Sequence, residues 1–172
     1  FPYVPILSVT APLIEAQLVE TALLNIINYS SLISTKAARI TSAATSGNVL
    51  EFGLRRAQGD GAYIGVRSAL IGGCIGTSFV QAGKIWDCPV SGTQAHSWIQ
   101  AFNSEIDAFR AYAKIFPDNC LLLVDTYDVL RSGIPNAVEV AKELAKQNNE
   151  LLGVRIDSGD LGYLAMEAYR QF

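Results

Sequence analysis

The sequence is poor in the residues from which metal centres, disulfide frameworks and nucleic-acid surfaces are built. Its 172 residues include one histidine and three cysteines, which are widely spaced and form no Cys-x-x-Cys pair. These counts argue against a structural zinc site and against a disulfide framework, so we expect buried free thiols. The net charge is −3, and no run of lysine or arginine occurs. This charge pattern argues against nucleic-acid binding.

Long hydrophobic runs are absent as well. No apolar stretch approaches the roughly 18 residues that a bilayer-spanning helix needs, and no signal-peptide pattern is visible. Together with the free cysteines, this favours a protein of the reducing cytosol that does not bind membranes.

Apolar residues, by contrast, make up 50% of the chain, and charged residues only 17%. This is more hydrophobic than a free-standing soluble surface requires, although the length suits one domain. The chain starts at Phe1, and Phe172 falls inside a helical pattern. We therefore expect an internal part of a longer protein, with apolar surface covered by the rest of the polypeptide or by a second subunit.

Hydrophobic periodicity predicts strands and helices in alternation. The predicted strands cover 5–9, 49–52, 77, 89–91, 121–125 and 151–156. The predicted helices cover 15–45, 62–70, 80–85, 105–116 and 135–147, with a last one opened by Ser158 and Asp160 and running to the end. Ser104 is the expected N-cap of the helix that Pro117 ends. Strand and helix alternate about six times with short connections, which favours parallel strands in part of an α/β barrel. A Rossmann sheet is less favoured, because no G-x-G-x-x-G follows the first strand.

Polar residues follow four of the predicted strands. In a parallel α/β sheet or barrel the carboxyl ends of the strands form one face, and ligands bind there. We therefore expect one cavity at that face, lined by Arg55, His96, Asp125, Arg155 and Asp157.

Two chemistries are open for the histidine and the carboxylates. His96 could act as an acid, a base or a nucleophile that accepts a phosphoryl group, and the plain alternative is a structural histidine. Asp125 and Asp157 follow apolar strands, where a buried carboxylate needs a partner, so both are expected to face a polar cavity. The alternative for both is a helix N-cap.

The arginines point to an anionic ligand. Arg155 lies between Val154 and Ile156, so its side chain should project inward if theirs pack on the helices. An inward arginine usually meets an anion. Arg55 and Arg56 are adjacent and diverge, so one of them at most should reach the site. A cavity with several cations and two carboxylates suits a phosphorylated sugar.

Five segments, in this order and spacing, resemble the nicotinate phosphoribosyltransferase family of the type II phosphoribosyltransferase fold. Each one alone is a weak signal, and the five in register are a specific one. They are ETALLNIINYSSLISTKAARI (20–40), EFGLRRAQGDGA (51–62), GTQAHSW (92–98), DTYDV (125–129) and GVRIDSGDL (153–161).

The resemblance implies a reaction in which nicotinate displaces pyrophosphate from phosphoribosyl pyrophosphate. The product is nicotinate mononucleotide, for NAD synthesis, and ATP hydrolysis is coupled through a phosphorylated histidine. His96 matches that histidine, and Asp125 and Asp157 match the acidic pair around ribose, pyrophosphate and Mg²⁺. The family's substrate-contacting positions fall on Arg55 and Arg155, with Ser97 close to the nicotinate carboxylate. Mg²⁺ accompanies phosphoribosyl pyrophosphate and ATP.

The resemblance also implies what surrounds the chain. Residues 1–172 correspond to part of the α/β-barrel domain, without the family's N-terminal domain and without the later strands and their phosphate loop. The full-length protein is expected to be a homodimer, and the 172 residues alone are expected to be inactive. The alternatives are a nicotinamide-using relative and a truncated, non-catalytic product that acts through protein contacts. A barrel lyase or aldolase is disfavoured, because the lysines fall on helical patterns rather than at strand ends.

Overall fold

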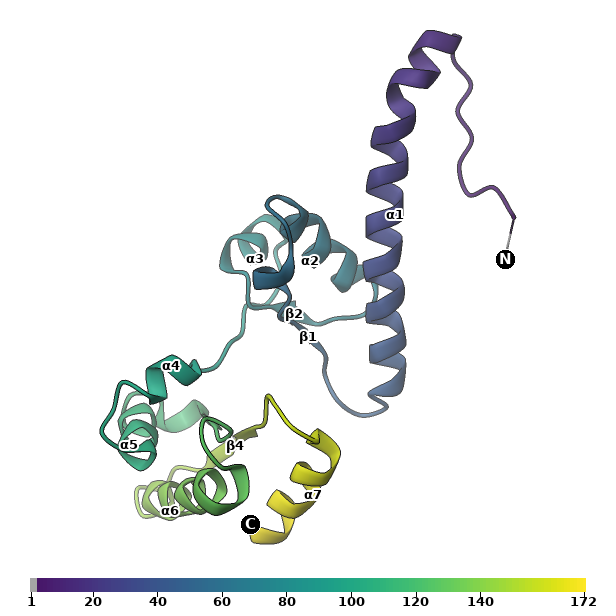
Figure 1. Ribbon diagram of the computed structural model, residues 1–172. Coiled ribbons are helices and arrows are strands. Elements are labelled where there is room, and N and C mark those ends of the chain that lie inside the picture. The colour runs from purple at the N-terminus through teal and green to yellow at the C-terminus, as the bar shows by residue number, and fades with distance from the viewer. Residues whose placement is uncertain (1–2) are drawn as a thin grey trace. The chain divides into compact units, whose positions relative to one another are not determined.

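The computed structural model describes residues 3–172 (Figure 1). The chain forms two compact units, Phe1–Gly92 and Thr93–Phe172, and each is described by itself. In both units short parallel strands are connected through helices, as the sequence predicted. Among residues 3–172, no helix is both long enough and apolar enough to cross a membrane.

The first unit joins a long helix to a small parallel sheet. Its sheet pairs β1 with β2, and Val90 extends the pairing by a parallel bridge to Thr77. Helix α2 packs against α1, and the Ser34 hydroxyl donates a hydrogen bond to the Ser68 carbonyl across this contact at 2.7 Å. The elements are α1 (Leu13–Ala43), β1 (Leu50–Glu51), the 3₁₀ turn η1 (Leu54–Arg56), α2 (Gly61–Ile71), β2 (Gly76–Thr77) and α3 (Val80–Trp86).

The strand predicted over residues 5–9 is wrong. Residues 4–10 form no strand, and their side chains are exposed. The weak alternation of apolar residues there is not enough, because a strand also needs a partner to satisfy its backbone groups. Within residues 3–172 this segment finds none.

The second unit holds the larger core. Strands β3 and β4 pair in parallel, with Leu122 opposite Val154 and Leu123 opposite Arg155. The apolar run of β3 is buried, as predicted for a strand covered on both faces. The elements are α4 (His96–Ile99), α5 (Glu105–Ile115), the 3₁₀ turn η2 (Pro117–Asn119), β3 (Cys120–Leu123), the π-helical turn η3 (Val129–Gly133), α6 (Ile134–Ala145), β4 (Leu151–Arg155) and α7 (Leu161–Gln171).

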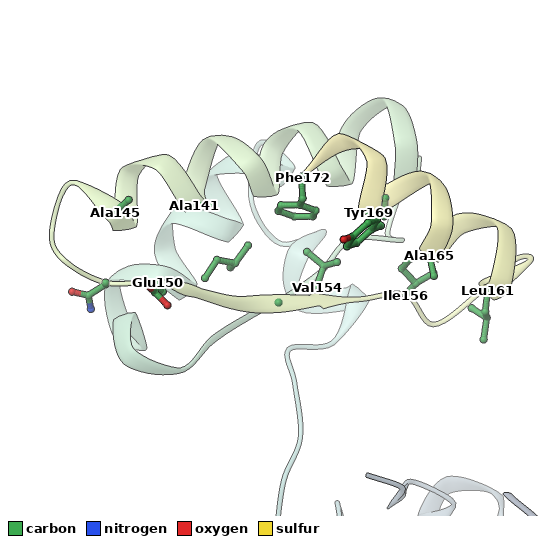
Figure 2. A pocket seen from close by; sticks show the side chains of 13 residues that line it. Ala141, Ala145, Glu150, Val154, Ile156, Leu161, Ala165, Tyr169 and Phe172 are labelled. Atoms are coloured by element: carbon green, nitrogen blue, oxygen red, sulfur yellow. The ribbon is translucent and has the colours of Figure 1, made fainter. Parts of the chain in front are cut away.

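Strand β4 borders an apolar groove of about 770 Å³ between α6 and α7 (Figure 2). Ala141 of α6, Val154 of β4 and Tyr169 of α7 are among its lining residues. Leu152 of β4 is 65% exposed. Within residues 3–172, β4 pairs only with β3, so its other edge is open and can accept another strand.

The turn η3 packs tightly beneath the end of β3. A Cβ atom added to Gly133 would lie 2.0 Å from the Val124 carbonyl oxygen, which is backbone and cannot swing aside. Val124 directly precedes Asp125, so this glycine contact sets how the chain leaves β3.

We expect Gly133→Ala to destabilise the protein by about 1–3 kcal/mol or more, the usual cost of overpacking a core. Gly92→Ala is the matched control, because a Cβ there would meet nothing within 4 Å. Urea unfolding measures both. Equal stabilities for the two variants would show that the η3 contact does not constrain the end of β3.

Candidate active site

The segment that leads to His96 is attached to the edge of β3 through a buried glutamine. With the Gln94 amide oriented to satisfy both of its groups, Nε2 donates to the Leu121 carbonyl at 2.9 Å and Oε1 accepts from the Leu123 amide at 3.3 Å. The side chain therefore imitates a neighbouring strand. This contact holds Gln94 against β3, and Gln94 lies only two positions before His96.

His96 begins the short helix α4 instead of lying in the loop that the sequence predicted. Ile99, which is fully buried, and Trp98, which packs on the core and against the Phe102 ring, anchor this single turn. The imidazole Nε2 lies 3.1 Å from Asp125 Oδ1, and the His96 side chain is 40% exposed. The ring is thus held at one nitrogen while part of it faces solvent.

Asp125 lies two residues beyond β3, and its side chain is almost completely buried. Its Oδ1 contacts His96, and its Oδ2 accepts a hydrogen bond from Ser158 Oγ at 2.5 Å. The N-cap alternative is therefore wrong for Asp125. The N-cap role after β3 falls to Asp128, whose carboxylate accepts from the amides of Leu130 and Arg131.

The environment of Asp125 favours its ionised form. Burial, the largest single influence, would raise the pKa of this carboxyl, but the hydrogen bonds from Ser158 and His96 hold the pKa below its ordinary value. The backbone amide of Asp157 acts in the same direction, and so does the positive charge of the imidazole whenever the ring is protonated. A buried carboxylate with hydrogen bonds to both oxygens is a fixed negative charge at neutral pH.

Arg155 and Asp157 form an ion pair at the end of β4. Arg155 Nη2 lies 2.6 Å from Asp157 Oδ1, and Nη1 donates to Thr93 Oγ1 at 2.8 Å. Val154 and Ile156 pack on the core, as predicted, and the projection of Arg155 into a barrel interior stays a prediction. Asp157 is not an N-cap either, because Asp160 accepts from the Tyr163 amide and caps α7.

The structure thus gathers four of the predicted residues at the carboxyl ends of β3 and β4, namely His96, Asp125, Arg155 and Asp157. Ser97 follows His96 in α4 and is exposed. Arg55 lies on η1 in the first unit, exposed, after the end of β1. Its approach to the other four residues stays a prediction, as do the roles of all six.

Sequence reasoning missed the polar residues that support this group. It expected Ser158 only as a helix opener, and it gave no role to Thr93 or Gln94. In the first unit it missed Glu51, whose carboxylate accepts from Thr77 Oγ1 at 2.7 Å and also from the Gly53 amide. The available signal was their position, since each lies within a few residues of a strand end or of a predicted site residue.

Within residues 3–172, no cluster of three or more histidine, cysteine, aspartate or glutamate side chains could hold a metal ion. Both oxygens of Asp125 already have partners, and Asp157 is paired with Arg155. A divalent cation at this site would need ligands from the substrate.

This geometry defines the class of protein: an α/β chain with parallel strands and with charged groups at the carboxyl ends of those strands. Residues 48–172 match the model of the nicotinate phosphoribosyltransferase (NAPRTase) family. The match covers most of the chain and includes both strand pairs and all six predicted site residues. The chain therefore belongs to this family.

Individual relatives agree with the family match. The chain is 56% identical over 165 residues to a nicotinate phosphoribosyltransferase of Bacillus subtilis, covering 95% of this chain and 33% of the relative. It is 41% identical over 218 aligned positions to that of Caenorhabditis elegans, covering 97% of this chain and 38% of the relative. The chain thus spans 33% to 38% of the length of these relatives.

Solved structures support the fold. The crystal structure of human nicotinic acid phosphoribosyltransferase matches with a TM-score of 0.86 and 36% identity, over 99% of this chain and 44% of that one. The crystal structure of nicotinate-nucleotide pyrophosphorylase from Pyrococcus furiosus matches with a TM-score of 0.71 and 28% identity. This match covers 83% of this chain and 37% of that one. The predicted α/β phosphoribosyltransferase fold is confirmed, and whether both units belong to one barrel domain stays a prediction.

Asp125 should contribute to stability in a pH-dependent way. Because folding lowers its pKa, the stabilisation is fully present above the ordinary value of 3.8 and is lost as pH falls through the lowered value. Asp125→Asn should therefore cost about 1–3 kcal/mol near neutral pH, and the cost should shrink on acidification. Urea unfolding across a pH series checks this, with exposed Asp60→Asn as control. A cost that stays constant down to the most acidic samples would contradict it.

Proposed function

We propose that this chain carries the histidine-bearing face of a nicotinate phosphoribosyltransferase. The enzyme would form nicotinate mononucleotide and pyrophosphate from nicotinate and phosphoribosyl pyrophosphate, with coupled ATP hydrolysis, in NAD biosynthesis. The observation that carries the proposal is the contact between His96 Nε2 and the buried Asp125 carboxylate, in a chain of this family. A histidine held in this way can take part in group transfer.

The contact with Asp125 supports different tasks for the two nitrogens of His96. An ionised carboxylate only accepts hydrogen bonds, so the shared proton belongs on Nε2. Nδ1 then keeps its lone pair and is the nucleophile toward the γ-phosphorus of ATP. The N–P bond forms, the bond from phosphorus to the bridging oxygen breaks, and ADP leaves with that electron pair. Nδ1 carries no proton to be removed, and the Asp125 carboxylate stabilises the positive charge that develops on the ring.

Asp157 and Arg155 suit the phosphoribosyl transfer. When the bond from ribose to pyrophosphate breaks, positive charge develops on the sugar and negative charge on the diphosphate. Asp157 is half-exposed and can meet ribose hydroxyls or Mg²⁺ carried by the diphosphate, while Arg155 offers a guanidinium to the leaving group. Mg²⁺ enters as part of the substrates phosphoribosyl pyrophosphate and ATP. Arg55 and Ser97 would complete the pyridine and carboxylate contacts.

The setting of the enzyme is part of the proposal. The full-length protein would act in the cytosol as a homodimer, on small-molecule substrates and without nucleic acid or membrane. Nicotinate is proposed over nicotinamide because the relatives described above carry nicotinate or nicotinic acid in their names. Steady-state assays of the full-length protein with both bases test this choice, and a preference for nicotinamide would overturn it.

In the full-length protein, His96→Ala should abolish stimulation by ATP and leave slow phosphoribosyl transfer, because transfer itself depends mainly on positioning and charge stabilisation. His96→Gln is the companion variant, since its amide can still donate to Asp125 but cannot accept phosphate. Product formation with and without ATP measures the coupling. Acid-labile phosphate on another residue, with normal ATP coupling in either variant, would refute the assignment.

Residues 1–172 alone should bind a hydrophobic dye and show no turnover. The groove beside β4 and exposed side chains such as Leu152 leave apolar surface uncovered. Dye fluorescence, gel filtration and a product assay test this. A monomer that melts cooperatively and makes nicotinate mononucleotide would contradict the proposal that the remaining length of the family's chains is needed.

A further inference from the structure

Ser158 completes a chain of three polar groups that come from three separate segments. Its hydroxyl lies 2.5 Å from Asp125 Oδ2, and Asp125 Oδ1 lies 3.1 Å from His96 Nε2. Ser158 follows β4, Asp125 follows β3, and His96 opens α4. The middle carboxylate has a side-chain exposure of only 1%, so these neighbours, and not water, decide how it is oriented.

We propose that Ser158 is a positioning residue that selects which nitrogen of His96 accepts the phosphoryl group. This inference rests on the proposed function of His96. The terminal torsion of an aspartate side chain is broad and has no strong preference of its own. With Oδ2 held by Ser158, Oδ1 is directed at Nε2, the shared proton stays on Nε2, and Nδ1 presents its lone pair.

Asp125 is held by side-chain and backbone hydrogen bonds together. Within residues 3–172, the side-chain hydrogen bonds to Asp125 come from His96 and Ser158, and the backbone amide of Asp157 adds a third. Loss of the Ser158 hydroxyl would leave one carboxylate oxygen without its side-chain donor, and the carboxylate could rotate.

The backbone around Ser158 forms a defined turn, although the residue itself is exposed. Gly159 has φ +82°, a left-handed conformation that a residue with a side chain rarely adopts. This turn takes the chain from Ser158 to Asp160, whose carboxylate accepts from the Tyr163 amide and caps α7. The serine is therefore fixed between the end of β4 and a capped helix, as a positioning group requires.

The experiment determines the phosphohistidine isomer in the full-length protein. The protein is incubated with Mg²⁺ and ATP, quenched in alkali and digested, and the Nδ1 and Nε2 isomers on the peptide containing His96 are separated. Wild type should give the Nδ1 isomer. Ser158→Ala should give a mixture containing the Nε2 isomer and phosphorylate roughly tenfold more slowly, the scale of one hydrogen bond to a charged group. Ser158→Thr, which keeps the hydroxyl, should restore the Nδ1 isomer.

Two further variants separate positioning from stability. Ser104→Ala removes the N-cap of α5, which costs stability away from Asp125, and should leave the isomer unchanged. Ser158→Cys keeps the size but offers only a weak donor, so it should shift the ratio toward the Nε2 isomer even if the alanine variant folds poorly. A pure Nδ1 isomer at the wild-type rate in Ser158→Ala or Ser158→Cys overturns the inference. Wild-type protein without phosphohistidine overturns the proposed function itself, and the inference with it.

Discussion

The buried carboxylate of Asp125 is the constraint on which the rest of the candidate site depends. A carboxylate removed from water is costly unless both of its oxygens have partners. Those partners come from α4 and from the segment after β4, so one side chain obliges three separate parts of the second unit to meet. The ion pair of Arg155 with Asp157 lies beside it and reaches back to Thr93, upstream of His96. The position of the His96 ring thus follows from the free-energy cost of burying the Asp125 carboxylate without a partner.

The surrounding packing makes this arrangement rigid. Leu122, Leu123 and Val124 lead into Asp125 and are fully buried. Val124 continues the ladder by donating its amide to the Arg155 carbonyl at 3.1 Å, so the two strand ends that carry the acid and the arginine are tied by backbone. Gly133 packs against the backbone of Val124 so closely that a Cβ atom would not fit. Asp125 directly follows Val124, so its backbone is held in place. Its carboxylate can then move mainly by rotation about the bonds of its own side chain.

The sequence predicted the parts of this unit that follow from periodicity. A continuous apolar run sufficed for β3, and Val154 and Ile156 pack on the core as their spacing around Arg155 predicts. Single hydrogen bonds carry no periodic signal, so Ser158 and Gln94 were not found. The π-helical turn η3 was missed, since its packing under Val124 is a tertiary contact. The prediction of a strand over 5–9 was wrong because the local pattern was present but no partner strand was, within residues 3–172.

The two carboxylates of the site lie in different environments. Asp125 is buried, hydrogen-bonded at both oxygens and kept ionised, which suits a group that orients an imidazole and never leaves it. Asp157 is half-exposed and held by an arginine, which suits a group that can exchange its partner for a ligand. Both follow parallel strands of the same sheet, yet one is enclosed and the other faces outward. Strand ends place the two charges, and burial then distinguishes them. A short stretch of parallel sheet thus holds one carboxylate that is enclosed and one that is accessible to solvent.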